Sequence, residues 1–99
     1  MMYTISKKNK VDGKIELPKY RRLALYLAND IKNGVYKIGA LIPSLGENSR
    51  EQGVSIPTVS SAYDLLRKHG VITLNVGVRY VVKSKNIDKF LAEEIEAYQ

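Results

Sequence analysis

Signals for two helices and the turn between them lie within residues 44–70, which read SLGENSREQGVSIPTVSSAYDLLRKHG. Ser44 precedes Glu47 by three positions, the spacing of a capping box, in which each side chain accepts a hydrogen bond from the other residue's backbone N–H. This spacing predicts a helix over Leu45–Gln52, although the segment is polar and holds only one large apolar side chain. Gly53 ends the helix, because glycine readily adopts the left-handed conformation of a helix C-terminus.

A second helix begins directly after this turn. Ser55 is suited to cap it, and Pro57 lies in its first turn, where a missing N–H costs nothing. Gly70 ends it. Its apolar face comprises Val59, Ala62, Tyr63 and Leu66, and its polar face largely comprises Ser60, Ser61, Asp64, Arg67 and Lys68. Two short helices joined by a three-residue turn form a helix-turn-helix, whose second helix is the one expected to enter a groove of DNA.

An earlier helix is predicted over residues 18–33. Pro18 suits the first turn, and apolar residues then recur at spacings of three and four: Tyr20, Leu23, Ala24, Leu27 and Ile31. Gly34 can take the left-handed conformation of a C-cap. Residues 37–40 are expected to form a tight turn, and residues 41–42 a very short strand.

A β-hairpin is predicted after the helix-turn-helix. Its strands are Val71, Ile72 and Leu74, then Tyr80, Val81 and Val82, and residues 75–77 supply the turn. A hairpin in this place is the layout of a wing. The predicted fold is therefore mostly α with a small β-wing: a winged helix-turn-helix with a three-helix core, a two-stranded hairpin and a C-terminal helix.

Three parts follow one another along the chain. Residues 1–17 form a basic arm, residues 18–83 the winged-helix domain, and residues 84–99 a C-terminal helix with one apolar stripe. The stripe comprises Ile87, Phe90, Leu91, Ile95 and Tyr98. It predicts either the interface of a homodimer, which we favour, or packing in cis onto the first helix of the same chain.

The net charge of +6 is unevenly distributed. Residues 87–99 contain four acidic residues and one lysine, so the positive charge belongs to the rest of the chain. A basic body indicates an anionic partner such as nucleic acid. The absence of cysteine excludes disulfides and thiolate metal sites and suits a reducing cytoplasm. No apolar run reaches the roughly 18 residues of a membrane span, so no membrane partner is expected.

The order and spacing of these signals resemble the DNA-binding module of the GntR family of bacterial transcription regulators. The matching pieces are Pro18-Lys19-Tyr20, Asn33-Gly34, Gly39, Ile42-Pro43-Ser44, Gly53-Val54-Ser55, Thr58-Val59, His69-Gly70-Val71-Ile72 and residues 77–82. They cover about two-thirds of the chain without a gap. The resemblance implies a homodimeric regulator that binds specific double-stranded DNA sequences in the bacterial cytoplasm, associated with the nucleoid. No small-molecule effector is expected within this chain.

Three arginines that are usual in the family are absent here. Gly46 stands two residues after the serine that opens the first helix of the motif, Ile56 follows glycine-valine-serine, and Ser60 follows threonine-valine. In the family those arginines read bases and clamp phosphates, so this chain is not expected to use the family's usual operator. Arg79 replaces the second glycine of the wing and restores one positive contact.

Candidate DNA-binding residues lie at the helix starts and in the wing. Predicted phosphate contacts are Lys19, Arg21, Ser44, Thr58, Arg79 and Lys83. Predicted base readers are Ser55, Ile56, Pro57, Ser60 and Ser61, among which Ile56 can touch a thymine methyl. Tyr20, Gly77 and Tyr80 complete the set, although a core position suits Tyr20 better and Tyr80 equally well. Because serine hydroxyls discriminate weakly between bases, useful affinity is expected to require a dimer.

Two other functions fit the same sequence. One is partition or replication control in a plasmid or phage, and the other is a winged helix that binds protein in place of DNA. The sequence contains no convincing catalytic combination, glycine-rich phosphate loop or metal-ligand cluster. We therefore expect no enzyme activity, no metal and no cofactor. His69, the single histidine, is expected to be solvated or to cap the C-terminus of a helix.

Overall fold

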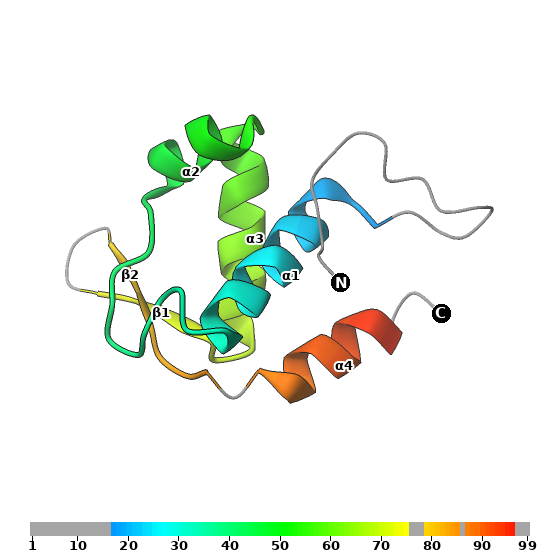
Figure 1. The fold of residues 1–99 in the computed structure, drawn as a ribbon. Helices are drawn as coiled ribbons and strands as arrows, with labels where there is room; N and C mark the ends of the chain where they lie inside the picture. The colour runs from blue at the N-terminus through cyan, green and yellow to red at the C-terminus, as the bar shows by residue number, and fades with distance from the viewer. Residues whose placement is uncertain (1–16, 76–78, 86, 97–99) are drawn as a thin grey trace.

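The computed structural model describes residues 17–75, 79–85 and 87–96, so all of the predicted arm (residues 1–17) except Leu17 lies outside the described residues. The elements, in chain order, are α1 (Lys19–Lys32), α2 (Leu45–Gln52), α3 (Ile56–Lys68), β1 (Ile72–Leu74), β2 (Tyr80–Val82) and α4 (Asp88–Glu96). Figure 1 shows α1 crossing α3, with α2 at one end of α3 and the hairpin at the other. The prediction of a mostly helical fold with one small hairpin is confirmed.

The helix ends follow from local chemistry. The backbone N–H of Ser44 donates to Glu47 Oε1 at 2.9 Å, and the N–H of Glu47 donates to Ser44 Oγ at 3.1 Å, so the capping box is complete. Gly53 ends α2 at a φ of +67°, in the left-handed region. The start of α1 differs slightly from the prediction: Pro18 has a non-helical ψ of 153° and is the N-cap, so the helix begins one residue later.

The hydrophobic core lies where α1 crosses α3 and where the hairpin covers them. The predicted stripe of α1 supplies Leu23, Ala24, Leu27 and Ile31, and α3 supplies Val59, Ala62, Tyr63 and Leu66. Both sets are essentially inaccessible to solvent, which confirms their predicted faces. Among the described residues, Arg22 and Asn48 are the buried polar side chains, and the sequence predicted neither.

The hairpin is antiparallel, and the α1–α2 linker extends it. Ile72 pairs with Val82 and Leu74 with Tyr80. Leu41 forms a single β-bridge to Val81, which confirms that the linker contains a very short extended segment. The linker thereby brings the start of α2 next to β2. The predicted turn over residues 75–77 falls largely outside the described residues.

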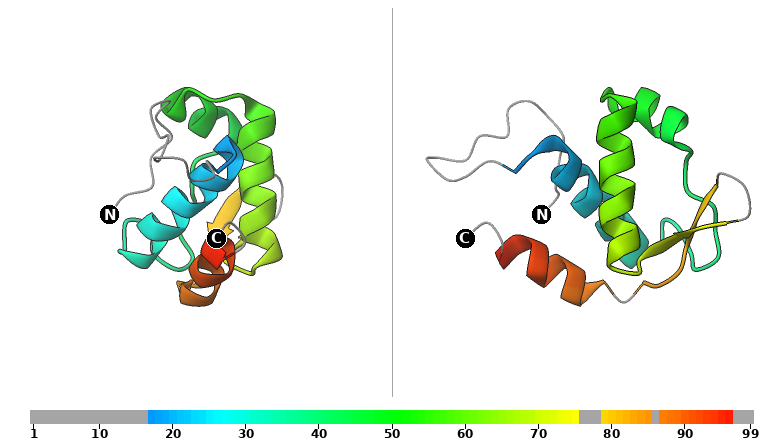
Figure 2. Two further views of the ribbon diagram at one scale, coloured as in Figure 1. Left: turned by 90° about the vertical axis from the view of Figure 1, so that its right-hand side faces the viewer. Right: turned by 180° about the vertical axis from the view of Figure 1, so that it is seen from behind.

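The last helix packs onto its own chain. Ile87 and Phe90 are 1% and 3% exposed, and the ring of Phe90 meets that of His69 edge-on at 4.8 Å. Lys32 Nζ, at the end of α1, lies 2.9 Å from Asp88 Oδ1. Figure 2 shows that α4 and the hairpin lie on opposite sides of the α1–α3 pair.

This packing corrects part of the predicted dimer interface. Ile87 and Phe90 belong to the core of their own chain, because α4 covers the C-terminal ends of α1 and α3. Leu91 is half-buried against the same core. The side chains of Ile95 and Tyr98 lie outside the described residues, so an interface through them stays a prediction.

Candidate nucleic-acid interface

The start of α3 presents small and apolar side chains to solvent. Ser55, Ile56 and Pro57 are exposed, and Ile56 keeps half of its surface (50%) accessible. Single exposed apolar side chains are common on protein surfaces, and Val35 and Ile38 are exposed as well. The exposure of Ile56 leaves it free to touch an apolar group of a partner.

The hydroxyls of Ser55 and Thr58 lie at the start of α3, and they can still form a hydrogen bond to a partner. Ser55 Oγ accepts a hydrogen bond from the N–H of Thr58 at 3.3 Å and lies 2.8 Å from Thr58 Oγ1. One of these hydroxyls donates to the other, so one of the two protons stays available for an outside acceptor. Ser60 and Ser61 continue the polar face one turn further, half-buried and exposed respectively.

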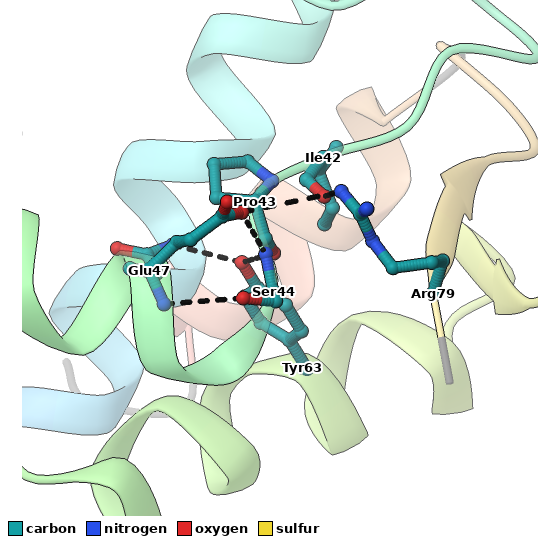
Figure 3. Close-up of polar contacts among 7 residues, drawn as sticks. Ile42, Pro43, Ser44, Glu47, Tyr63 and Arg79 are labelled. Atoms are coloured by element: carbon teal, nitrogen blue, oxygen red, sulfur yellow. Dashed lines mark hydrogen bonds and ion pairs between the residues drawn. The ribbon is translucent and has the colours of Figure 1, made fainter.

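Two hydrogen bonds of Tyr63 set the position of α2 against α3 (Figure 3). Tyr63 Oη, on α3, donates to the carbonyl of Pro43 at 2.7 Å and accepts from Asn48 Nδ2, on α2, at 2.9 Å. Burial raises the pKa of Tyr63 to about 12, so the phenol remains a donor at neutral pH. These two hydrogen bonds explain how α2, which is mostly polar, is attached to the rest of the fold. The local pattern shows only that Asn48 lies one turn after Leu45, on the same side of the helix, and the partner Tyr63 is fifteen positions away.

Arg79 reaches from the hairpin to the start of α2 (Figure 3). Its Nη2 donates to the carbonyl of Ile42 at 3.4 Å and lies 4.0 Å from Glu47 Oε1. The hydrogen bond from the Ser44 backbone lowers the pKa of Glu47, and the charge of Arg79 lowers it further. The predicted phosphate contact at Arg79 is therefore partly occupied within the chain. Ser44 Oγ accepts from Glu47, so its own proton is available to a phosphate.

The remaining candidates are spread around this face or away from it. Lys19 is exposed at the start of α1, and the guanidinium of Arg21 lies 5.4 Å from the ring centre of half-buried Tyr20. Lys83 is exposed after β2, where it lines a hollow of about 450 Å³ with Arg67, Lys68 and Thr73 among others. Gly77 lies outside the described residues.

Tyr80 requires a correction as a DNA contact. Its side chain is only 8% exposed, and its ring meets that of Tyr63 edge-on at 4.9 Å. An aromatic pair of this geometry stabilises the core beyond the area it buries. Of the two positions that the sequence allowed for Tyr80, the core is the one observed.

In the part of the chain that the structure describes, no three His, Cys, Asp or Glu side chains gather closely enough to hold a metal ion. Over residues 17–75, 79–85 and 87–96, no helix has the length and apolar composition needed to cross a bilayer. His69 caps α3 as predicted, and it also lies 3.5 Å from Glu93 Oε1 of α4.

The profile of the bacterial regulatory proteins of the gntR family matches residues 19–82. That segment is more than half of the chain and contains α1, α2, α3 and the hairpin. The chain belongs to the gntR family. The family resemblance seen in the sequence is confirmed, and the winged-helix fold with it.

Two curated relatives are HTH-type transcriptional regulators of Escherichia coli K12, both described as uncharacterized. YjiR is 42% identical over 57 residues, and YdcR is 35% identical over 71 residues. These segments cover 58% and 72% of this chain but only 12% and 15% of the relatives. The chain thus spans a small part of the length of these two regulators.

Solved structures agree with this assignment. YtrA from Sulfolobus acidocaldarius, a GntR-family transcription factor, is 33% identical, with a TM-score of 0.69 over 89% of this chain and 93% of that one. BusR from S. agalactiae, solved in complex with its busAB promoter DNA, is 25% identical, with a TM-score of 0.68 over 85% of this chain and 40% of that one. Both matches extend beyond the segment that the family profile covers.

Proposed function

We propose that this gntR-family chain binds specific sequences of double-stranded DNA as a homodimer and regulates transcription in the bacterial cytoplasm. The observation that carries the proposal is the exposed start of α3, held at a defined angle beside α2 and the hairpin. The likeness to YtrA, a transcription factor, and to BusR, solved on promoter DNA, supports the same function.

The base-reading surface is small and partly apolar. Ile56, exposed at the start of α3, matches the methyl group that thymine presents in the major groove. Ser60 and Ser61 offer hydroxyls that both donate and accept, which suits several bases. No arginine lies on this part of α3, so readout in each half-site is weak, and sequence preference favours thymine.

Phosphate contacts supply most of the affinity. Lys19 at the start of α1, the hydroxyl of Ser44 and the guanidinium of Arg79 come from different elements of the fold. Each neutralised phosphate releases counterions, so affinity falls steeply with salt. Two copies, paired through Ile95 and Tyr98 near the C-terminus, would present half-sites about one helical turn apart, roughly 34–36 Å.

Selection from a random duplex library tests this function. The purified chain is expected to enrich an inverted repeat with thymines in each half-site, and native mass measurement of the enriched complex is expected to find two chains per duplex. Recovery of no common sequence after repeated rounds would contradict sequence-specific binding. Recovery of a single, non-repeated site with one chain bound would contradict the homodimer.

A further inference from the structure

Arg50 occupies the surface above Gly46 on α2. A Cβ built on Gly46 would lie 3.8 Å from Arg50 Nη1. Side chains on a helix lean toward its N-terminus and cover the residue four positions earlier. Because Gly46 has no side chain, the guanidinium of Arg50 lies over the first turn of α2. Arg50 is exposed, so it can leave this position without disturbing the core.

Arg79 reaches the same turn from the hairpin. It comes from the residue directly before β2, and its Nη2 lies 4.0 Å from Glu47 Oε1. Its side chain is 41% exposed, so part of the guanidinium faces solvent. Two arginines from separate elements therefore lie near the first turn of α2, and Figure 3 shows the approach of Arg79.

Glu47 is the common neighbour of the two arginines. Its Oε1 accepts the hydrogen bond from the Ser44 backbone, which has the largest effect in lowering its pKa. The charges of Arg79 and Arg50 lower that pKa further, as expected for a carboxylate near two guanidinium groups. At neutral pH the turn thus holds two positive charges and one negative charge.

We propose that Arg50 and Arg79 together bind one backbone phosphate of DNA, and that Glu47 weakens this contact by its charge. The proposal rests on the function proposed above. A guanidinium binds phosphate through a planar fork of N–H donors, and two such forks hold a single phosphate from two sides. The phosphate competes with the Glu47 carboxylate for the two guanidinium groups. The carboxylate is fixed by its capping hydrogen bond, so its negative charge repels the bound phosphate. Glu47 is in this way a built-in limit on non-specific affinity.

Charge-neutral variants separate these roles. Glu47→Gln keeps the cap, because glutamine serves in a capping box as well as glutamate does, but removes the repulsion. It is expected to bind a random duplex about two- to fivefold more tightly at low salt, in line with the size of exposed charge interactions. Arg50→Gln is expected to bind more weakly, because the phosphate loses one of its two guanidinium partners and keeps only Arg79. Glu51→Gln is the matched control, because it removes an equal charge from an exposed site on the same helix.

The dissociation constants are measured by fluorescence anisotropy over a salt series, and circular dichroism confirms that each variant folds. Tighter binding by Glu47→Gln than by Glu51→Gln, with weaker binding by Arg50→Gln than by the original chain, supports the proposal. Equal binding by Glu47→Gln and Glu51→Gln, or an unchanged affinity for Arg50→Gln, overturns it while leaving DNA binding by the original chain intact. Failure of the original chain to bind any duplex would overturn this proposal and the proposed function together.

Discussion

Tyr63 of α3 donates a 2.7 Å hydrogen bond to the carbonyl of Pro43, the residue just before the cap of α2. The same hydroxyl accepts a hydrogen bond from Asn48, in the middle of α2. One phenol oxygen of α3 therefore binds both the residue before the cap of α2 and a residue within that helix. Since α2 has almost no apolar face, these bonds largely replace the packing that usually sets the angle of a helix pair. The arrangement of Ser44, Glu47 and Arg79 therefore depends on Tyr63.

Tyr63→Phe is expected to destabilise the chain by about 1–3 kcal/mol. The substitution leaves the carbonyl of Pro43 and the amide of Asn48 without their partner, and buried polar groups that lose a hydrogen bond carry a penalty of that size. Urea unfolding followed by circular dichroism measures the loss. Tyr26→Phe is the matched control. It also removes one hydroxyl, from half-buried Tyr26 of α1, but Tyr26 takes no part in the hydrogen bonds between Tyr63, Pro43 and Asn48. An equal loss in both variants would contradict the account.

The stability of the chain is expected to fall at high pH because of Tyr63. Burial raises the pKa of Tyr63 from 10.0 to about 12, so above pH 10 the unfolded chain loses this proton before the folded chain does. The stabilisation is complete below pH 10 and is lost as pH rises toward 12. Urea unfolding from pH 8 to pH 12 measures it. The Tyr63→Phe variant should lose less stability over this range, and an identical pH profile would contradict the assignment.

The cis packing of α4 predicts different effects along its stripe. Phe90→Ala is expected to lower the stability by about 3 kcal/mol, near the low end for a buried phenylalanine, because α4 lies at the edge of the core. Ile95→Asp and Tyr98→Asp are expected to convert the homodimer to a monomer. Thermal unfolding measures the stability of Phe90→Ala, and light scattering measures the mass of the two aspartate variants.

Leu91→Ala serves as the control for the first effect, since Leu91 is only half-buried and should lose less stability than Phe90→Ala. A dimer mass retained by both aspartate variants would contradict pairing through the end of α4. A monomer mass for the unsubstituted chain would contradict the homodimer directly.

Ser60→Ala and Lys19→Ala are expected to alter DNA binding in different ways. Ser60 is proposed to read bases from α3, so its loss should change the order of preference among sequences. Lys19 is exposed at the start of α1 and is proposed to neutralise a phosphate, so its loss should weaken binding to all sequences and shallow the salt slope by about one unit. Competition binding against a panel of duplexes separates the two outcomes. A uniform loss for Ser60→Ala would contradict its role as a reader.

Local signals predicted the helix ends, and long-range contacts account for what they missed. The Ser44–Glu47 box and the left-handed Gly53 depend on residues a few positions apart, so spacing alone reveals them. The burial of Asn48 depends on Tyr63, fifteen positions away, and the contact between Arg79 and Ile42 joins residues thirty-seven positions apart. The stripe of α4 had the same appearance for packing in cis and in trans, because periodicity reports an apolar face without reporting what covers it.

The central claim is that the face formed by α2, α3 and the hairpin contacts DNA phosphates. The most direct measurement is the binding of the purified chain to a random duplex over a series of salt concentrations. Measurable binding is expected at low salt. The logarithm of the association constant is expected to fall linearly with the logarithm of the salt concentration, with a slope of several units for each bound dimer. No binding at low salt, or an affinity that does not change with salt, would contradict this claim.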